Sequence, residues 1–133
     1  MKLTTKSEYS ILALIYIARF EEGGFVKIED ICSKYNISKK YLENLLTVLK
    51  QNRLLKTRRG IHGGYKLARP SSEISIAEIV RLMDGALAAV ESVSKYFYFS
   101  TPLEAEIKVI NVFRDIRDYI SDKLENVKIS DLV

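Results

Sequence analysis

Cysteine, histidine and long apolar runs are scarce in this chain of 133 residues. Cys32 and His62 are the only residues of their types, so no internal disulfide can form and no cluster of sulfur and nitrogen ligands is available to a metal. The longest apolar run, Ile11 to Ala18, is far shorter than the roughly 20 residues that cross a bilayer, and no signal peptide is recognisable. We therefore expect a cytoplasmic protein with no metal site and no membrane partner.

Groups of residues that support catalysis are missing as well. The sequence has no Ser/His/Asp set, no pair of carboxylates in an apolar setting and no phosphate-binding glycine loop. The glycines in GIHGGY lie between two predicted strands, whereas a nucleotide-binding loop leads into a helix. We expect no enzymatic activity, no catalytic residue and no cofactor.

Positive charge is concentrated in the first half of the chain. Residues 1–70 hold 14 Lys and Arg against 6 Asp and Glu, whereas residues 71–133 hold 7 against 11. The first part thus carries +8 and the second −4, which together give the +4 of the whole chain. This asymmetry fits either a first half that faces phosphates or a solvated basic surface.

The segment ISKKYLENLLTVLKQN, which starts at Ile37, predicts an amphipathic helix. Its leucines recur at i, i+3, i+4 and i+7 between Leu42 and Leu49, and Ser38 is a suitable N-cap. A shorter helix over residues 27–35 precedes it after a tight turn, so the two make a helix-turn-helix. Cys32 falls on the apolar face of the shorter helix, where we interpret it as a buried hydrophobe and not as a reactive thiol.

Two short runs after this helix, residues 54–58 and 65–68, predict a β-hairpin with a tip rich in arginine and glycine. A helix with short polar side chains and lysines, followed by such a hairpin, is typical of a winged helix. The helix would enter a major groove of DNA, and the hairpin would lie over an adjacent minor groove or backbone. We therefore expect a mainly α fold with a small β-hairpin wing.

Three capping boxes mark the remaining helices, which we predict over residues 5–20, 75–84 and 101–126. The first helix is apolar nearly all round, so it must be buried on more than one side. The last has an apolar face broader than one contact within the chain needs, which suggests a dimerisation helix. We divide the chain into a winged-helix DNA-binding domain, 1–85, and a connecting segment with the dimerisation helix, 86–133.

Four consecutive aromatic residues, Tyr96 to Phe99, lie in the connecting segment, which has no helical or strand period. They could wall a small-molecule pocket or form a patch for a partner. Aromatic residues at this density are more often part of a core, and we predict that position for them.

Five segments, in this order, resemble the Rrf-type winged-helix transcription regulators: MKLTTKSEYSILAL, ISKKYLENLL, TRRGIHGGYKLARP, ISIAEIVRLMDG and the ending ISDLV. This family includes the iron–sulfur cluster regulator IscR, the nitric-oxide sensor NsrR and the cysteine-metabolism repressor CymR. The resemblance covers most of the chain and implies a winged helix-turn-helix plus a long C-terminal dimerisation helix. The implied partners are double-stranded DNA with a two-fold operator and a second copy of the chain, with room for a small-molecule or protein effector.

The cysteines of the cluster-binding members have no counterpart here. Those members carry three cysteines between the fourth helix and the dimerisation helix, and the corresponding stretch, GALAAVESVSKYFYFSTPLE, contains none. Glu8 stands where some members place an acidic cluster ligand, but its predicted capping role accounts for it. The chain therefore resembles the clusterless branch, of which the cysteine-metabolism repressor is the familiar example.

The resemblance also places individual residues at DNA-contact positions of the helix and at the wing tip, and the basic pattern adds their neighbours. The complete predicted DNA-binding set is Ser38, Lys39, Lys40, Tyr41, Glu43, Asn44, Arg58, Arg59, Gly60, His62, Gly63 and Gly64. We interpret Glu43 as an acceptor for the N4 amino group of cytosine, and the alternative is a solvent-facing residue paired with Lys39 or Lys40. His62 either approaches DNA or is an exposed turn residue.

The predicted function is a sequence-specific DNA-binding regulator, a repressor that acts as a homodimer without an iron–sulfur cluster. The alternative is a winged-helix protein-interaction module that has lost DNA binding. Retention of both the Lys39–Lys40 pair and the Arg58–Arg59 pair argues against that alternative.

Overall fold

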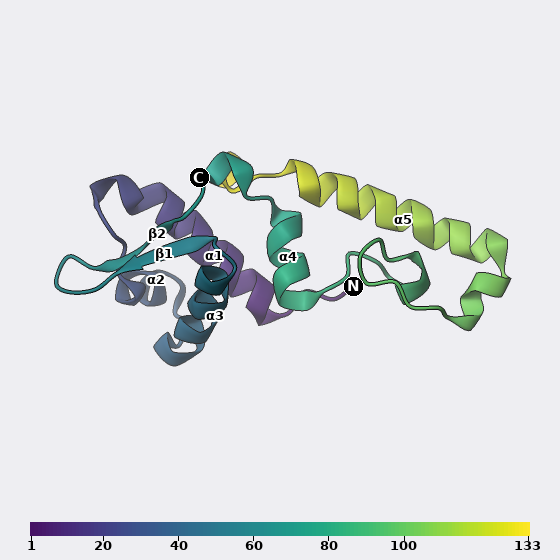
Figure 1. The fold of residues 1–133 in the computed structure, drawn as a ribbon, viewed down its shortest axis with the longest axis horizontal. Coiled ribbons are helices and arrows are strands. Elements are labelled where there is room, and N and C mark those ends of the chain that lie inside the picture. The colour runs from purple at the N-terminus through teal and green to yellow at the C-terminus, as the bar shows by residue number, and fades with distance from the viewer.

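A computed structural model describes all 133 residues (Figure 1). In chain order, its elements are α1 (Thr5–Phe20), α2 (Ile28–Tyr35), α3 (Lys39–Gln51), β1 (Leu55–Arg58), β2 (Gly64–Leu67), α4 (Ile76–Asp84) and α5 (Ile107–Asn126). Short 3₁₀ turns occupy residues 21–23, 71–73, 91–93, 102–105 and 129–132. The predicted winged helix-turn-helix with a long C-terminal helix is confirmed.

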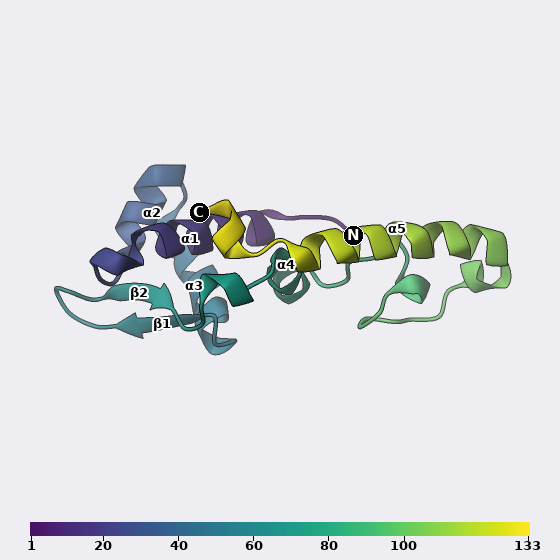
Figure 2. The ribbon, with the colours of Figure 1, turned by 90° about the horizontal axis from the view of Figure 1, so that it is seen from above.

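The molecule is elongated in both views, with α1–α3 and the hairpin at one end (Figures 1 and 2). The connecting segment, residues 86–106, lies on the side of α4 that faces away from the hairpin, and α5 runs back from there toward α1. No helix combines the length and the apolar character that crossing a membrane requires.

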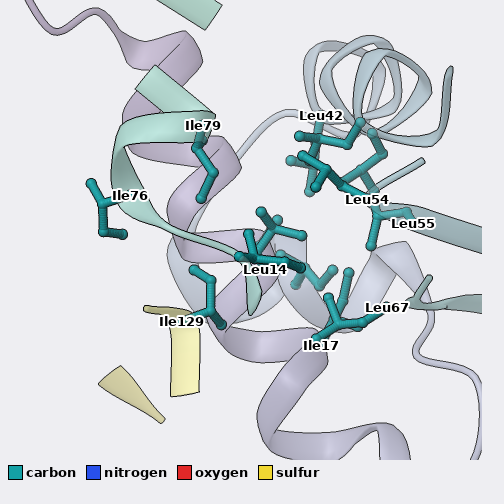
Figure 3. Close-up of a cluster of buried hydrophobic side chains, with 14 of the residues drawn as sticks. Leu14, Ile17, Leu42, Leu54, Leu55, Leu67, Ile76, Ile79 and Ile129 are labelled. Atoms are coloured by element: carbon teal, nitrogen blue, oxygen red, sulfur yellow. The ribbon is translucent and has the colours of Figure 1, made fainter. Parts of the chain in front are cut away.

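Helix α1 lies at the centre of the core, as its apolar sequence predicts. Leu14 and Ile17 are fully buried, and Figure 3 shows Leu14 between Leu42 of α3, Ile79 of α4 and Leu67 of β2, with Ile17 beside Leu67. Removal of a fully buried leucine, as in Leu14→Ala, is expected to cost about 2–5 kcal/mol of folding free energy. The core thus fixes α3 and the hairpin on one scaffold.

The last residues of the chain return to this core. Ile129 is fully buried, its N–H donates to the carbonyl of Ile74 at 2.9 Å, and the N–H of Ile76 donates to the carbonyl of Val127 at 3.0 Å. The predicted division of the chain into two domains at residue 85 stays a prediction. The C-terminal end of the second predicted domain lies beside the first. A second, smaller apolar cluster joins the connecting segment to α5 through Ala88, Val93 and Ile110.

Two of the three predicted capping boxes are wrong, because other residues bond the side chains concerned. Helix α1 is capped by Thr4 and not by Thr5: the Thr4 hydroxyl accepts from the N–H of Lys6 at 3.2 Å, while its own hydroxyl donates to Asp84 at 2.6 Å. Glu8 therefore has no capping role and is exposed. Ser75, the first residue of the second predicted box, does cap α4, with its hydroxyl accepting from the N–H of Glu78.

The long helix starts later than predicted. The Thr101 hydroxyl donates to Ser92 at 2.9 Å, and the Glu104 carboxylate accepts from the hydroxyls of Tyr98 and Ser100, so neither capping side chain is free. A 3₁₀ turn forms at Pro102–Ala105 instead, and α5 begins at Ile107. Its 20 residues span about 30 Å.

The aromatic run does not belong to the core, contrary to our prediction. Tyr96, Phe97, Tyr98 and Phe99 are 69%, 47%, 58% and 68% exposed. The small cluster around Ile110 is filled by Ala88 and Val93 and by partly buried Val90, Leu103 and Phe113, so the four rings remain outside it.

Candidate nucleic-acid interface

The helix-turn-helix is formed by α2 and α3, and its turn depends on one left-handed residue. Asn36 has φ 54°, and the next residue, Ile37, donates its N–H to the carbonyl of Cys32 at 3.1 Å. Asparagine tolerates this conformation better than most residues, because its short polar side chain bonds locally. The turn orients α3 so that its four leucines, Leu42, Leu45, Leu46 and Leu49, are buried.

The opposite face of α3 is polar and exposed, as predicted. Ser38 occupies the N-cap position, but its hydroxyl makes no capping bond and is free for other partners. Lys40, Glu43 and Asn44 are exposed, and their side chains have no hydrogen-bond or ion-pair partner within the chain. This face therefore offers both hydrogen-bond donors and hydrogen-bond acceptors to an external partner.

Lys39 pairs with Glu29 of α2 at 3.0 Å, and not with Glu43. The Glu29 hydrogen bond raises the pKa of the Lys39 ammonium, and the same bond lowers the pKa of the Glu29 carboxyl. Both side chains are more than half exposed, so this pair contributes little to stability. In the alternative interpretation, Glu43 forms an ion pair on the helix surface. Lys39 is not its partner in such a pair.

Tyr41 is half-buried and fixes α3 against α1. Its hydroxyl shares a hydrogen bond with the hydroxyl of Thr5 at 2.9 Å, and its ring meets the edge of the Tyr9 ring at 5.7 Å between centroids. Tyr41, which belongs to the predicted DNA-binding set, therefore anchors α3 to α1 and lies at the border of the exposed face.

The wing is a two-stranded antiparallel hairpin in which Leu55 pairs with Leu67 and Arg58 with Gly64. A third segment supports it: the N–H groups of Val26 and Tyr65 each donate to the other residue's carbonyl at 2.8 Å. Close to this bridge, the Lys27 ammonium donates to the carbonyl of Ile61 at 2.8 Å and so holds the wing tip. Residues 25–27 therefore brace the hairpin from the side.

The glycines of the wing differ in their roles. Gly60 has φ 100° at an open turn, a conformation that favours glycine. A Cβ atom on Gly63 would lie 2.1 Å from the carbonyl oxygen of Arg58, and one on Gly64 would lie 2.3 Å from that of Val26. We conclude that Gly63 and Gly64 are required for close backbone packing of the wing.

The charged tip residues have few internal contacts. Arg59 and His62 are exposed and have no partner within the chain, and the Arg58 guanidinium lies 6.0 Å from the centre of the Phe25 ring. The ammonium of Lys66 lies over the same ring at 5.1 Å. Phe25 thus contacts two cationic side chains of the hairpin. The sequence did not indicate this role, because Phe25 lies in a loop.

A groove of about 300 Å³ separates α3 from the hairpin. It is lined by Thr47 and Lys50 of α3, Thr57 and Arg58 of β1, and Gly64 and Tyr65 of β2. Burial raises the pKa of the Tyr65 phenol, with the Glu43 and Glu29 carboxylates adding to the shift, so its hydroxyl stays protonated. The sequence set included only Arg58 and Gly64 of this group. The leucine period of α3 is the signal that could have added Thr47 and Lys50, because it leaves both on the exposed face.

Known proteins resemble this chain over nearly its whole length. A family model named Rrf2 and described as an iron-dependent transcriptional regulator matches residues 3–133. A candidate helix-turn-helix-type transcriptional regulator from Mycobacterium tuberculosis is 35% identical over 99% of this chain and 81% of that protein. The helix-turn-helix-type regulator IscR of Escherichia coli is 30% identical over 100% of this chain and 80% of that protein.

A solved structure supports the same relationship. CymR, the global cysteine regulator of B. subtilis, matches with a TM-score of 0.79 at 27% identity, over 99% of this chain and 95% of that one. The match includes both the helix-turn-helix end and the long C-terminal helix, since so little of either chain is left out.

The side chains present do not fit the iron that the family description names. Iron–sulfur clusters are held by cysteine thiolates, sometimes with histidine, and the connecting segment has neither residue. Cys32 packs against the core, and burial raises the pKa of its thiol, which disfavours the thiolate that binds metal. No group of three or more His, Cys, Asp and Glu side chains lies close enough together to hold a metal ion.

Proposed function

The chain belongs to the Rrf2 family of transcriptional regulators, and we propose that it is a homodimeric, cytoplasmic repressor that binds a two-fold DNA operator without an iron–sulfur cluster. The observation that carries this proposal is the pairing of α3 with the hairpin. The exposed polar face of α3 and the basic wing border one groove, and both are fixed to the same core. Members of this family are regulators and not enzymes.

In the proposed complex, α3 enters the major groove and the wing follows the neighbouring backbone. Lys39, Lys40 and Lys50 would neutralise phosphates, while Glu43 and Asn44 would contact base edges. The N-terminal half of a recognition helix commonly reads bases, and both residues lie in that half of α3. A carboxylate accepts from the N4 amino group of cytosine and penalises base edges that present only acceptors, so Glu43 would act on specificity.

On the wing, Arg58, Arg59 and His62 would contact the backbone or the minor groove. Gly60, Gly63 and Gly64 would shape the tip, where the N–H of Gly63 donates to the carbonyl of Gly60 at 3.0 Å and closes the turn. Thr47, Thr57 and Tyr65 extend the predicted set, because their hydroxyl groups line the groove between helix and wing. Hydroxyl groups commonly bond phosphate oxygens at such positions.

A second copy of the chain would cover the outer face of α5. Val109, Val112, Ile116 and Tyr119 are all more than two-fifths exposed, and they recur at intervals of three, four and three residues. This spacing is that of the apolar seam between two packed helices. A homodimer joined there would present two wings and two copies of α3, as a two-fold operator requires.

Selection of bound fragments from a random pool of duplex DNA tests the proposal. We expect enrichment of one motif with two-fold symmetry, and individual selected duplexes should bind at least about a thousandfold tighter than scrambled ones. A pool that stays random after repeated rounds would favour the alternative, a winged-helix module that binds proteins and no longer binds DNA.

A further inference from the structure

The groove between α3 and the hairpin is the larger of the two hollows in the molecule. It holds about 300 Å³, at the lower end of the roughly 300–1,000 Å³ of small-molecule pockets. Helix and hairpin lie next to each other in both views (Figures 1 and 2). The groove is open to solvent and not enclosed, so it can take part of a longer molecule.

One uncompensated positive charge lies on the helix side of this groove. Lys50 lines it in the last turn of α3, is exposed, and has no hydrogen-bond or ion-pair partner within the chain. The ion pairs of the chain all join other residues, and no Asp or Glu lines the groove. An anion that enters the groove therefore meets a cation that no carboxylate of the protein neutralises.

Two hydroxyl groups lie on the hairpin side. Thr57 and Tyr65 are directly opposite each other in the register of β1 and β2, so their side chains share one face of the hairpin. Leu55 and Leu67 lie on this same face and are buried, so it is the face turned toward the core. Neither hydroxyl has a hydrogen-bond partner within the chain, so each keeps a donor for an external group.

The Tyr65 hydroxyl is held in place and stays protonated. Its ring packs against the core, and burial raises the pKa of the phenol, with the Glu43 and Glu29 carboxylates adding to the shift. These carboxylates repel an anion, and Lys39 pairs only with Glu29. A bound anion is therefore expected nearer Lys50, which lies about two turns further along α3 than Glu43.

Two other lining residues contribute less to anion binding. The Thr47 hydroxyl donates to the carbonyl of Glu43 at 2.8 Å, so its proton is already used. Arg58 follows Thr57 in the strand, so its side chain points to the opposite face, where the guanidinium lies 6.0 Å from the centre of the Phe25 ring. The groove thus offers one cation and two hydroxyl donors.

The geometry of duplex DNA supplies an occupant for such a groove. A single sugar–phosphate backbone separates a major groove from the adjacent minor groove. If α3 lies in the one and the wing follows the other, this backbone passes between them. We propose that the groove seats one phosphate of that strand, bound by the Lys50 ammonium and by the hydroxyls of Thr57 and Tyr65. This inference rests on the proposed function, because it names the part of the DNA that the groove takes.

The seat would act on the position of the protein and not on base preference. A phosphate contact carries no sequence information, but it fixes the register and orientation of a protein on the duplex. Because α3 would hold the phosphate from one side and the hairpin from the other, the contacts on the two sides depend on each other. Loss of one contact would therefore weaken the other.

A double-mutant cycle measures this dependence. Lys50→Gln removes the charge, and Tyr65→Phe removes only the hydroxyl. Each should weaken binding of the dimer to a selected duplex by about four- to 25-fold, which is two- to fivefold for each protomer. The double variant should fall short of the product of these two losses by at least about fivefold, since residues that share a partner are not additive. Losses that simply multiply would overturn the shared phosphate.

Matched variants control for charge and for tyrosine hydroxyls elsewhere. Lys123→Gln on α5 and Tyr35→Phe on α2 should bind as the wild type does, because neither residue lines the groove. Lys40→Gln combined with Tyr65→Phe should give losses that multiply, because Lys40 lies at the start of α3 and outside the groove. A shortfall as large as that with Lys50→Gln would contradict the groove as the source of the coupling.

Methylphosphonate substitution of the selected duplex, one phosphate at a time, locates the seat. Each substitution removes one phosphate charge. In each half-site, one substitution should weaken the wild type and leave the Lys50→Gln/Tyr65→Phe variant nearly unaffected. If no phosphate shows this difference while the wild type binds the duplex, the seat is refuted and the proposed function stands. A wild type that binds no duplex refutes the proposed function, and the seat with it.

Discussion

Arg59→Ala tests whether the wing contacts DNA. Arg59 is exposed at the tip of the hairpin and has no partner within the chain, so its removal leaves no broken contact in the free protein. A phosphate contact by one arginine contributes about 0.9 to the slope of log K against log salt concentration. A dimer has two wings, so we expect the slope to become shallower by about 1.8.

The expected loss of affinity follows from the same contact. One exposed, charge-assisted hydrogen bond contributes about 1 kcal/mol, or about fivefold, and two wings give about 25-fold at low salt. Because a phosphate contact carries no base preference, operator and random duplexes should weaken by a similar factor.

Fluorescence anisotropy with a labelled duplex, measured from about 50 to 200 mM salt, gives both quantities. Arg114→Ala serves as the matched control, because Arg114 is also exposed but lies on α5. The wing plays no part in binding if Arg59→Ala retains both the affinity and the slope of the control.

Three further results are expected. Glu43→Ala should relax base preference at one position in each half-site and leave or raise non-specific affinity. The assay is a panel of single-base operator variants titrated at one salt concentration, and unchanged relative affinities would assign Glu43 to the solvent-facing role. Ile116→Asp should yield a monomer in sedimentation experiments, because it places a charge in the proposed seam, and the control Asn111→Asp on the same helix should stay dimeric. If both variants are dimeric, α5 does not form the interface. Protein purified without oxygen should be colourless and bind DNA equally with and without oxygen, and stoichiometric iron and sulfide would overturn the clusterless assignment.

The local sequence pattern was sufficient to predict the helix and the hairpin that form the proposed DNA surface. The leucine spacing of α3 and the strand runs on either side of GIHGGY predicted the helix and hairpin, because both signals depend on residues close together in the chain. The capping box at the start of α4 was predicted for the same reason, and Ser75 caps this helix. These features do not depend on where distant segments pack.

Predictions of helix capping failed where another residue competes for a capping side chain. Thr4, which is held by Asp84 80 residues away in sequence, replaces Thr5 as the N-cap of α1, although the helix itself begins at Thr5 as predicted. Tyr98 and Ser100 occupy the Glu104 carboxylate and delay α5. The Thr4–Asp84 bond joins residues far apart in the chain, and the contacts of Glu104 depend on how the connecting segment folds, so neither follows from a capping pattern.

The candidate site shows the same division between local and distant information. Exposure of Lys40, Glu43 and Arg59 follows from periodicity and turn position. The brace of the wing by residues 25–27 does not, because Phe25 and Lys27 contact hairpin residues that lie more than 30 positions away in sequence. The anchoring of Tyr41 by Thr5 likewise joins two helices that are distant in sequence.

Hydroxyl-radical footprinting of the protein on a selected duplex tests the central claim most directly. If two chains joined through α5 each place one copy of α3 and one wing on DNA, the protected sugars should form two blocks related by a two-fold axis. Their centres should lie about 10 base pairs, or a small multiple of one helical turn, apart along the duplex. A single block without symmetry, or uniform protection along the fragment, would contradict the dimeric mode of binding.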